Sequence, residues 1–271
     1  MEKIKVFLAD PQVLFREGIH FILSGEEDFE VIGETTGNEE ALSLIETNPP
    51  NVAILSIHDA KINGTDITSR IRRNMPAVFV ILIMDKKEPE KVFNSLKSGA
   101  SACLTKDSDP EQLLNTIRIV AQGSLPIIEE MFNPAIVSLI LDEFEDLSGL
   151  NDQFDNMLAS LTPREKQILS MIAAGSKVEQ IAAKTDTDED SIRHGLRVIL
   201  TKLIANEQTR SIIEAAQRSM PSLVRAGKAG KTQDYISRTE FNEFRDNLMA
   251  QLKSFIGELT PESQVEKAKR R

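Results

Sequence analysis

Over the first 123 residues, five short apolar runs alternate with five segments of helical spacing, and this alternation constrains the fold most strongly. Strands are expected at 4–9, 30–33, 52–55, 78–83 and 102–104, and helices at 13–23, 38–45, 67–71, 89–98 and 110–121. Strands that alternate with helices form a parallel sheet with helices on both faces, an α/β fold. Ligands of such sheets bind at the carboxyl ends of the strands. Four residues are therefore expected around one site: Asp10, Ser56, Ile83 and Lys106.

Three stretches of this segment resemble the receiver domain of bacterial response regulators of the NarL/FixJ type. They read VFLADPQVLFREGI, PNVAILSIHDAKINGTD and GASACLTKDSDPEQLLNTIRIVAQG. The resemblance covers nearly all of residues 1–123 and implies a flavodoxin-like (CheY-like) sheet of five parallel strands. It also implies a site where two adjacent acidic residues hold Mg²⁺, an aspartate accepts a phosphoryl group, and a Ser or Thr contacts that group.

The chain departs from this family pattern at the site itself. The corresponding positions are occupied by Asp10 and Pro11, by Ser56, by Ile83, and by the one retained lysine, Lys106. Ser56 offers no anionic oxygen to Mg²⁺, and Ile83 cannot hydrogen-bond a phosphoryl oxygen. We expect a pseudo-receiver that holds no metal and no other cofactor. Asp10 and Lys106 are expected to form an ion pair that steadies the loops, with a ligand role as the alternative.

Two further residues, His58 and Cys103, lie near the expected site. His58 has no second His or Cys at ligand spacing, so a metal or base role is disfavoured. The aromatic switch position of the family is Cys103 here. An enzyme with Ser56 as its nucleophile is a third alternative, disfavoured because the motif contains no activating base.

Residues 124–159 are expected to form a helical linker. An apolar stripe in 134–147 predicts a helix that packs on the receiver or on its copy in a dimer, and its composition is not that of a flexible linker.

The stretch LTPREKQILSMIAAGSKVEQIAAKTDTDEDSIRHGLRVILTKL resembles the LuxR-type DNA-binding domain, over 160–218. Thr162 and Glu165 flank a proline and predict the start of a helix. After a short second helix, Asp188 is predicted to cap a longer helix that runs through Leu203. Three short helices with a tight turn indicate an all-α helix-turn-helix domain.

The last helix of such a motif enters the major groove, and its N-terminal residues face base edges. Arg193, His194 and Arg197 lie there, and the two arginines are one turn apart. Arginine contacts guanine bidentately and also holds phosphates. The candidate phosphate contacts are Ser191, Thr201, Lys202 and Arg210.

Other residues of this domain disfavour the binding of DNA. Glu179 and the acidic run 186–190 repel phosphates, and Gly195 lowers helix propensity by about 1 kcal/mol. We expect modest, salt-sensitive DNA binding. The alternative is that the arginines form only a solvated face.

Residues 219–271 are expected to hold a flexible linker, an amphipathic helix at 238–259 and a basic tail. The apolar stripe of that helix fits a short coiled coil or docking on its own chain.

The net charge of −10 is uneven: −14 for residues 1–159, +1 for 160–218 and +3 for 219–271. This asymmetry permits nucleic-acid contact by residues 160–271 without requiring it. A single cysteine excludes a disulfide framework and favours the cytoplasm, and no segment is apolar enough to span a membrane.

The sequence thus predicts an atypical response regulator that binds double-stranded DNA as a homodimer, independently of aspartyl phosphorylation, and that is not an enzyme. The alternative is an adaptor whose receiver or C-terminal helix binds another protein and whose DNA-binding domain is vestigial.

Overall fold

A computed structural model describes residues 3–57, 63–151 and 158–219. By its contacts the chain divides into residues 1–212 and 213–271, and only the first residues of the second unit are described. The helix expected at 238–259 and the residue His58 lie outside the described residues.

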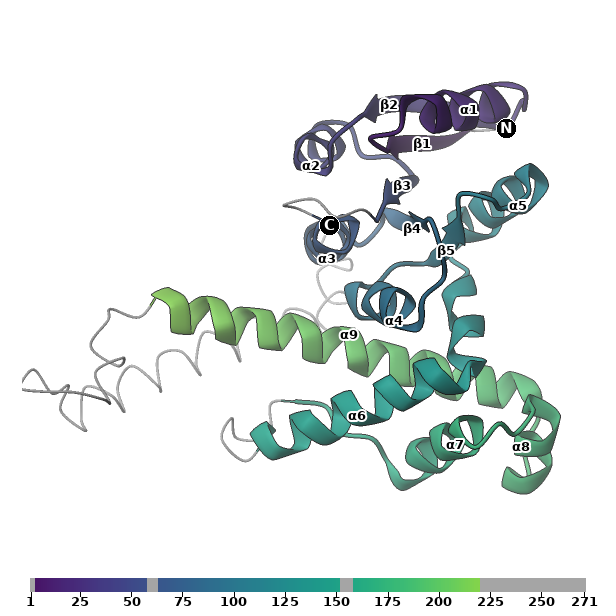
Figure 1. The fold of residues 1–271 in the computed structure, drawn as a ribbon, viewed down its shortest axis with the longest axis vertical. Helices are drawn as coiled ribbons and strands as arrows, with labels where there is room; N and C mark the ends of the chain where they lie inside the picture. Colours follow the sequence, from purple (N-terminus) through teal and green to yellow (C-terminus); the bar gives the residue numbers. More distant parts are fainter. Residues whose placement is uncertain (1–2, 58–62, 152–157, 220–271) are drawn as a thin grey trace, which may run out of the picture. The chain divides into compact units, whose positions relative to one another are not determined.

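The predicted five-stranded parallel sheet is confirmed (Figure 1). Its order is β2-β1-β3-β4-β5, and the strands are β1 (Ile4–Ala9), β2 (Phe29–Thr35), β3 (Val52–Ser56), β4 (Phe79–Met84) and β5 (Ala102–Thr105). β3, β4 and β5 are fully or almost fully buried, because helices cover both faces. The register sets Ser56 beside Ile83 and Ile83 beside Leu104.

Five helices cover the two faces of the sheet. They are α1 (Val13–Ser24), α2 (Asn38–Thr47), α3 (Gly64–Asn74), α4 (Pro89–Ser98) and α5 (Pro110–Ala121). Because side chains alternate along a strand, Val6 and Leu8 pack with α1 and α5, whereas Phe7 and Ala9 pack with α2, α3 and α4.

The described residues after α5 are mainly helical. They form the 3₁₀-helix η1 (Pro126–Phe132) and the helices α6 (Pro134–Asn151), α7 (Pro163–Ala173), α8 (Val178–Thr185) and α9 (Glu189–Ser219). The predicted cap of α7 is present, because Thr162 and Glu165 exchange hydrogen bonds in a capping box. None of the helices in the described part of the chain is long and apolar enough to cross a membrane.

Several predicted boundaries were wrong. Asn38 does not cap α2, since Gly37 holds that position. α3 begins earlier and ends later than the five residues expected, and η1 was not foreseen.

The largest boundary error is the end of α9, which continues past Leu203 to Ser219. No Gly or Pro interrupts 196–219. Asn206 holds this continuation against the chain before α7: it accepts from the Ala159 N–H at 2.7 Å and donates to the Ala159 carbonyl at 2.9 Å.

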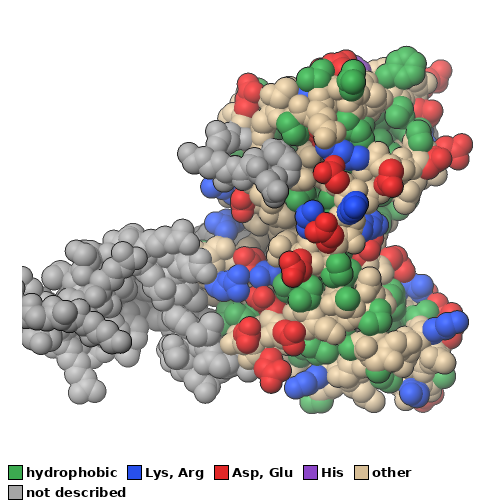
Figure 2. Space-filling view, in the orientation of Figure 1, with side chains coloured by type: hydrophobic (Ala, Val, Ile, Leu, Met, Phe, Trp, Pro, Cys, Tyr) green, Lys and Arg blue, Asp and Glu red, His purple; other side chains and the backbone are tan. Residues whose placement is uncertain are grey.

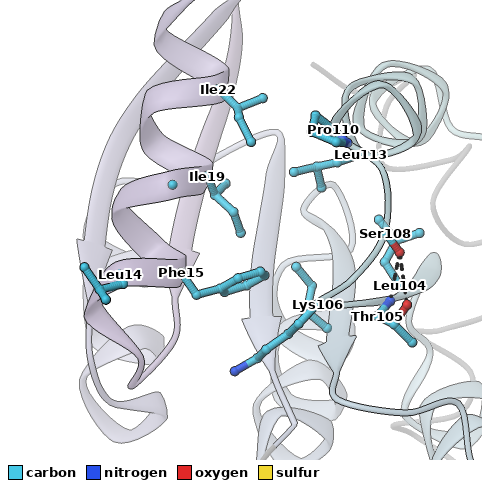
Figure 3. A pocket seen from close by; sticks show the side chains of 12 residues that line it. Leu14, Phe15, Ile19, Ile22, Leu104, Thr105, Lys106, Ser108, Pro110 and Leu113 are labelled. Atoms are coloured by element: carbon cyan, nitrogen blue, oxygen red, sulfur yellow. Dashed lines mark hydrogen bonds between the residues drawn. The ribbon is translucent and has the colours of Figure 1, made fainter.

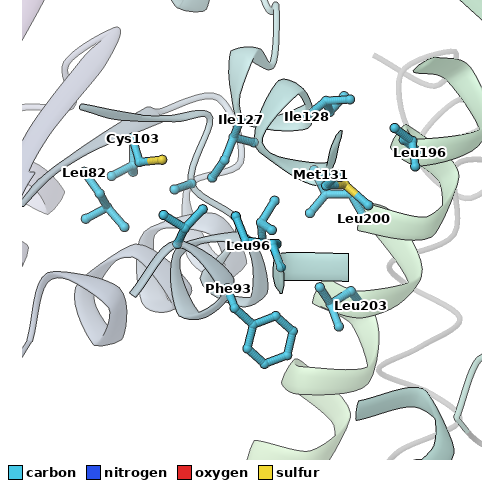
Figure 4. Packing of buried hydrophobic residues seen from close by; sticks show 14 of the residues in the cluster. Leu82, Phe93, Leu96, Cys103, Ile127, Ile128, Met131, Leu196, Leu200 and Leu203 are labelled. Atoms are coloured by element: carbon cyan, nitrogen blue, oxygen red, sulfur yellow. The ribbon is translucent and has the colours of Figure 1, made fainter. Parts of the chain in front are cut away.

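One apolar cluster joins the sheet to the helical part (Figure 4). From the sheet side it contains Leu82 and Leu96, and from α9 it contains Leu196, Leu200 and Leu203. Residues of η1 lie between them, with Met131 fully buried. The first unit therefore has a core that crosses the expected border between receiver and linker.

A network of four charged side chains lies beside this cluster. Lys97 of α4 lies 3.1 Å from the Glu143 carboxylate of α6 and 3.0 Å from that of Glu207 on α9. Arg210 contacts the same two carboxylates, at 3.0 and 3.3 Å. Only 10 % of the Lys97 side chain and 15 % of the Glu143 side chain are exposed, so these charges are screened less than surface pairs.

We expect Lys97→Ala to lower the free energy of unfolding of the full chain by about 1–3 kcal/mol, since it leaves two half-buried carboxylates with one cation. Urea unfolding measures this change. The matched control is Lys91→Ala on the same helix, where an exposed pair with Glu88 predicts a loss within about 0.5 kcal/mol. Equal losses in the two variants would contradict the stabilising role of the network.

Candidate functional site

The predicted site residues come together at the carboxyl edge of the sheet. Asp10 directly follows β1, Ser56 ends β3, and Ile83 lies in β4 opposite Ser56. Lys106 directly follows β5, and its backbone N–H donates to the Met84 carbonyl at 3.0 Å. Pro11 is exposed beside this site.

Asp10 and Lys106 form the expected ion pair. The Lys106 Nζ lies 3.0 Å from the Asp10 Oδ2, and the Asp10 side chain is only 6 % exposed. The other carboxylate oxygen of Asp10 accepts from the Gln12 N–H at 2.6 Å. Lys106 also lies 3.8 Å from the Asp85 carboxylate. Both groups that the chain keeps from the family pattern are thus engaged with each other.

Arg16 is a residue of this site that sequence reasoning missed. Its side chain is buried, its Nη1 donates to the Asp10 carbonyl at 2.8 Å, and its Nε lies 3.5 Å from the Glu34 carboxylate. The available signal was its position, because Arg16 shares the buried face of α1 with Ile19 and Leu23. A cation on an apolar helix face needs a partner.

Ser56 is enclosed at the end of β3. It is 1 % exposed, and its hydroxyl has no hydrogen-bond partner among the described residues. Its carbonyl accepts from the Asn38 amide at 3.3 Å. Gly64 approaches that carbonyl so closely that a Cβ at this position would lie 2.6 Å from it. The Asn63-Gly64 pair therefore fixes the backbone here as well as starting α3.

A small internal cavity lies beside Ser56. The cavity between Asp10, Ser56 and Ile83 measures about 10 Å³, the space of about one water molecule at most. No group of three His, Cys, Asp or Glu side chains is placed to hold a metal within the described ranges.

Cys103, at the family's switch position, is a core residue. It is 4 % exposed and packs near Leu82 (Figure 4). Burial raises the pKa of the Cys103 thiol to about 12, and the nearby Glu130 carboxylate adds to the shift. The thiol stays protonated at neutral pH and is therefore a poor nucleophile.

The predicted DNA-binding helix is the first part of α9. Asp188 caps it, because its carboxylate accepts from the Ser191 N–H at 2.6 Å. The apolar stripe packs inward as expected, formed by Ile192, Leu196, Ile199, Leu200 and Leu203. Four of the candidate DNA contacts lie exposed on the other side: Ser191, His194, Arg197 and Thr201.

The remaining three candidates are held by carboxylates of their own chain. Arg193 contacts Glu129 of η1 at 3.0 Å and Glu189 at 3.3 Å, which raises the pKa of its guanidinium further above its ordinary value. Lys202 lies 2.7 Å from Glu165. Arg210 belongs to the four-charge network described above.

The pair of Lys202 and Glu165 is part of the fold of this domain. Partial burial opposes ionisation of Glu165, but hydrogen bonds from Lys202 and Thr162 outweigh it and hold the pKa of Glu165 below its ordinary value. Lys202 also donates to the Ser160 carbonyl at 3.1 Å. A lysine with these partners is less available to phosphates than an exposed one.

Comparison with known proteins identifies both parts of the chain. Residues 6–118 match the response regulator receiver domain family, and residues 159–215 match the family of bacterial regulatory proteins described as the luxR family.

Curated relatives align with this chain over most of their own length. The transcriptional regulatory protein DegU of Brevibacillus brevis is 28 % identical over 224 residues, which cover 79 % of this chain and 93 % of that protein. The nitrate/nitrite response regulator protein NarL of Escherichia coli strain K12 is 26 % identical over 215 residues, covering 79 % and 94 %. A solved DNA-binding response regulator of the LuxR family from Staphylococcus aureus is 26 % identical, with a TM-score of 0.42, and covers 44 % of this chain and 98 % of that one. The chain is thus a response regulator with a receiver domain and a luxR-type DNA-binding domain, and it is a regulator of transcription.

Proposed function

We propose that this regulator binds double-stranded DNA through the first part of α9, as a homodimer, and that its receiver acts without aspartyl phosphorylation. The proposed organisation is a pseudo-receiver at 1–123, a helical linker at 124–159, the DNA-binding domain at 160–218 and an extension at 219–271.

The enclosed site at the sheet edge is the observation that supports the proposed lack of phosphorylation. Ser56 replaces the acceptor carboxylate, and Ile83 fills the space opposite it. Lys106, which would otherwise meet a phosphoryl oxygen, is neutralised by Asp10 at 3.0 Å. Uptake of a phosphoryl group would require this pair to separate and a cavity of about 10 Å³ to expand.

We expect the full chain, incubated with acetyl phosphate and Mg²⁺, to show no phosphorylated species by intact-mass spectrometry. The matched control is a triple variant that restores the family residues, Pro11→Asp, Ser56→Asp and Ile83→Thr, which is expected to take up a phosphoryl group. An adduct located on Ser56 of the unaltered chain would refute the proposal.

The exposed face of α9 supports the proposed DNA contact. His194, Arg197 and Thr201 project from the side opposite the buried stripe, near the capped N-terminus of the helix. A helix N-terminus favours an approaching phosphate, although Glu189 and Asp190 in the first turn reduce this attraction. Arg193 becomes available on this face when its ion pair with Glu129 breaks.

We expect Arg193→Ala with Arg197→Ala to weaken binding to a selected duplex by about 2–4 kcal/mol and to lower the salt slope by about 1–2, because base and phosphate contacts are lost together. Fluorescence anisotropy with a labelled duplex at several salt concentrations measures both quantities. The charge-matched control is Arg70→Ala with Lys86→Ala, two exposed cations of the receiver. Unchanged affinity in the arginine variant would remove α9 as the DNA-binding helix.

The homodimer is proposed from symmetry, since a two-fold dimer presents two recognition helices to half-sites about one helical turn apart. We expect sedimentation equilibrium of the full chain to give twice the monomer mass of 30.2 kDa at micromolar concentrations. A monomer throughout the micromolar range would contradict this part of the proposal.

A protein-interaction adaptor is the second candidate. It is favoured by the ion pairs that hold Arg193, Lys202 and Arg210, because these cations would have to exchange a carboxylate for a phosphate. The duplex titration separates the two functions. Binding that is absent at low salt, where DNA contacts are strongest, would favour the adaptor.

A further inference from the structure

A second, larger cavity lies on the α1/α5 face of the sheet, next to the enclosed phosphoryl site. Its volume is about 250 Å³. Its walls come from α1, from the ends of β4 and β5, and from the loop and helix that follow β5 (Figure 3). The lining residues are Leu14, Phe15, Gly18, Ile19, Ile22, Ile83, Leu104, Thr105, Lys106, Ser108, Pro110 and Leu113.

The walls of this cavity are mainly apolar. Phe15 and Ile19 project from α1 toward the side of Lys106 and Leu113 (Figure 3). Ile83 and Leu104, paired on neighbouring strands, form part of the inner wall. Ile83 stands where the family has a hydroxyl residue. The same substitution that removes phosphoryl chemistry therefore makes this wall apolar.

Gly18 leaves space at the middle of α1. A Cβ built on Gly18 would meet no atom within 4 Å, and its φ is not positive. Neither backbone conformation nor crowding within the described chain accounts for a glycine here. Glycine is a poor residue for a helix interior, and at this position it keeps the cavity open.

The charges around the cavity disfavour an anionic occupant. Lys106 is the charged residue among the described lining, and Asp10 and Asp85 both contact it. Asp107 and Asp109 of the adjoining loop are exposed. The hydroxyls of Thr105 and Ser108 lie 3.2 Å apart and bond to each other, so they offer few free polar contacts.

We infer that this cavity is a binding site for a small, uncharged, largely apolar molecule, such as a substituted aromatic compound of about ten to twelve non-hydrogen atoms. The volume sets the size at protein-like packing density, and ligand pockets share this pattern of apolar walls with few polar groups. The occupant would touch Ile83, which also lines the small cavity beside Ser56, and Lys106, which pairs with Asp10 there.

The exposed side of α1 is a separate feature from the cavity that Gly18 lines. Other exposed apolar side chains lie on α1, with Phe21 81 % and Val13 53 % exposed, and the space-filling view shows apolar atoms in this region (Figure 2). Phe21 and Val13 do not line the cavity. Substitutions at Gly18 and Phe21 therefore separate occupation of the cavity from docking of a protein on α1.

The inference is tested with 1-naphthol as the probe and the full chain. The protein has no Trp and one Tyr, so naphthol fluorescence can be followed with little interference. We expect saturable binding with a Kd below about 1 mM. The anionic 1-naphthoate is expected to bind at least about fivefold more weakly, because Lys106, the charged side chain of the described lining, is already paired with Asp10 and Asp85.

Gly18→Met places a flexible apolar side chain in the cavity without a clash at its Cβ. We expect it to raise the Kd for 1-naphthol at least about tenfold, and Gly18→Leu serves as a second filling variant. Phe21→Ala is the control on the same helix and should retain the Kd within about twofold, because Phe21 does not line the cavity.

Absence of saturable 1-naphthol binding to the unaltered chain would overturn the inference. Unchanged affinity in both folded Gly18 variants would overturn it too. A loss in Phe21→Ala equal to that in Gly18→Met would also overturn it, in favour of a binding surface along α1. Because binding is measured directly, none of these outcomes depends on whether the chain binds DNA.

Discussion

The apolar cluster shared by the sheet and the helical part is the interaction on which the rest of the first unit depends. Leu96 of α4 and Leu200 of α9 belong to one buried set, with Met131 of η1 among them. Burial of such side chains is worth about 1.5–3 kcal/mol each. Helix α9 is therefore held by its apolar stripe, and its polar side is left for other contacts. A fragment that ended at Gly123 would leave Leu96 and its neighbours without this cover, and exposed apolar surface of that kind promotes aggregation.

The two sites described above share one residue, Ile83. Ile83 closes the phosphoryl site on one side and lines the 250 Å³ cavity on the other. With Ser56 enclosed and Lys106 bound to Asp10, the edge of the sheet has become a packed, neutralised structure. In the proposed phosphorylation-independent receiver, an input would act through shape or apolar contact, since Lys106 and Asp10 already neutralise each other.

Much of the fold follows from local patterns in the sequence. Apolar runs at strand length, the proline starts of α4 and α5, and the capping box of Thr162 all appear in the structure. The register that pairs Ser56 with Ile83 follows from parallel strands that end at one edge. The ion pair of Asp10 and Lys106 was foreseen for the same reason. What could not be predicted depends on contacts between separate elements. These are the ion pair of Arg16 with Glu34, the hydrogen bonds between Asn206 and Ala159 that hold the extension of α9, and the ion pair of Arg193 with Glu129.

The pairing of Arg193 with Glu129 would give salt two opposing effects on the proposed binding of DNA by α9. Dissolved ions weaken the attraction of DNA phosphates for the exposed cations of α9. The same ions screen the bond between Arg193 and Glu129, whose side chains are 37 % and 59 % exposed, and so release the arginine. The two effects partly cancel. The apparent number of counterions displaced by this chain would therefore understate the number of phosphates that it touches.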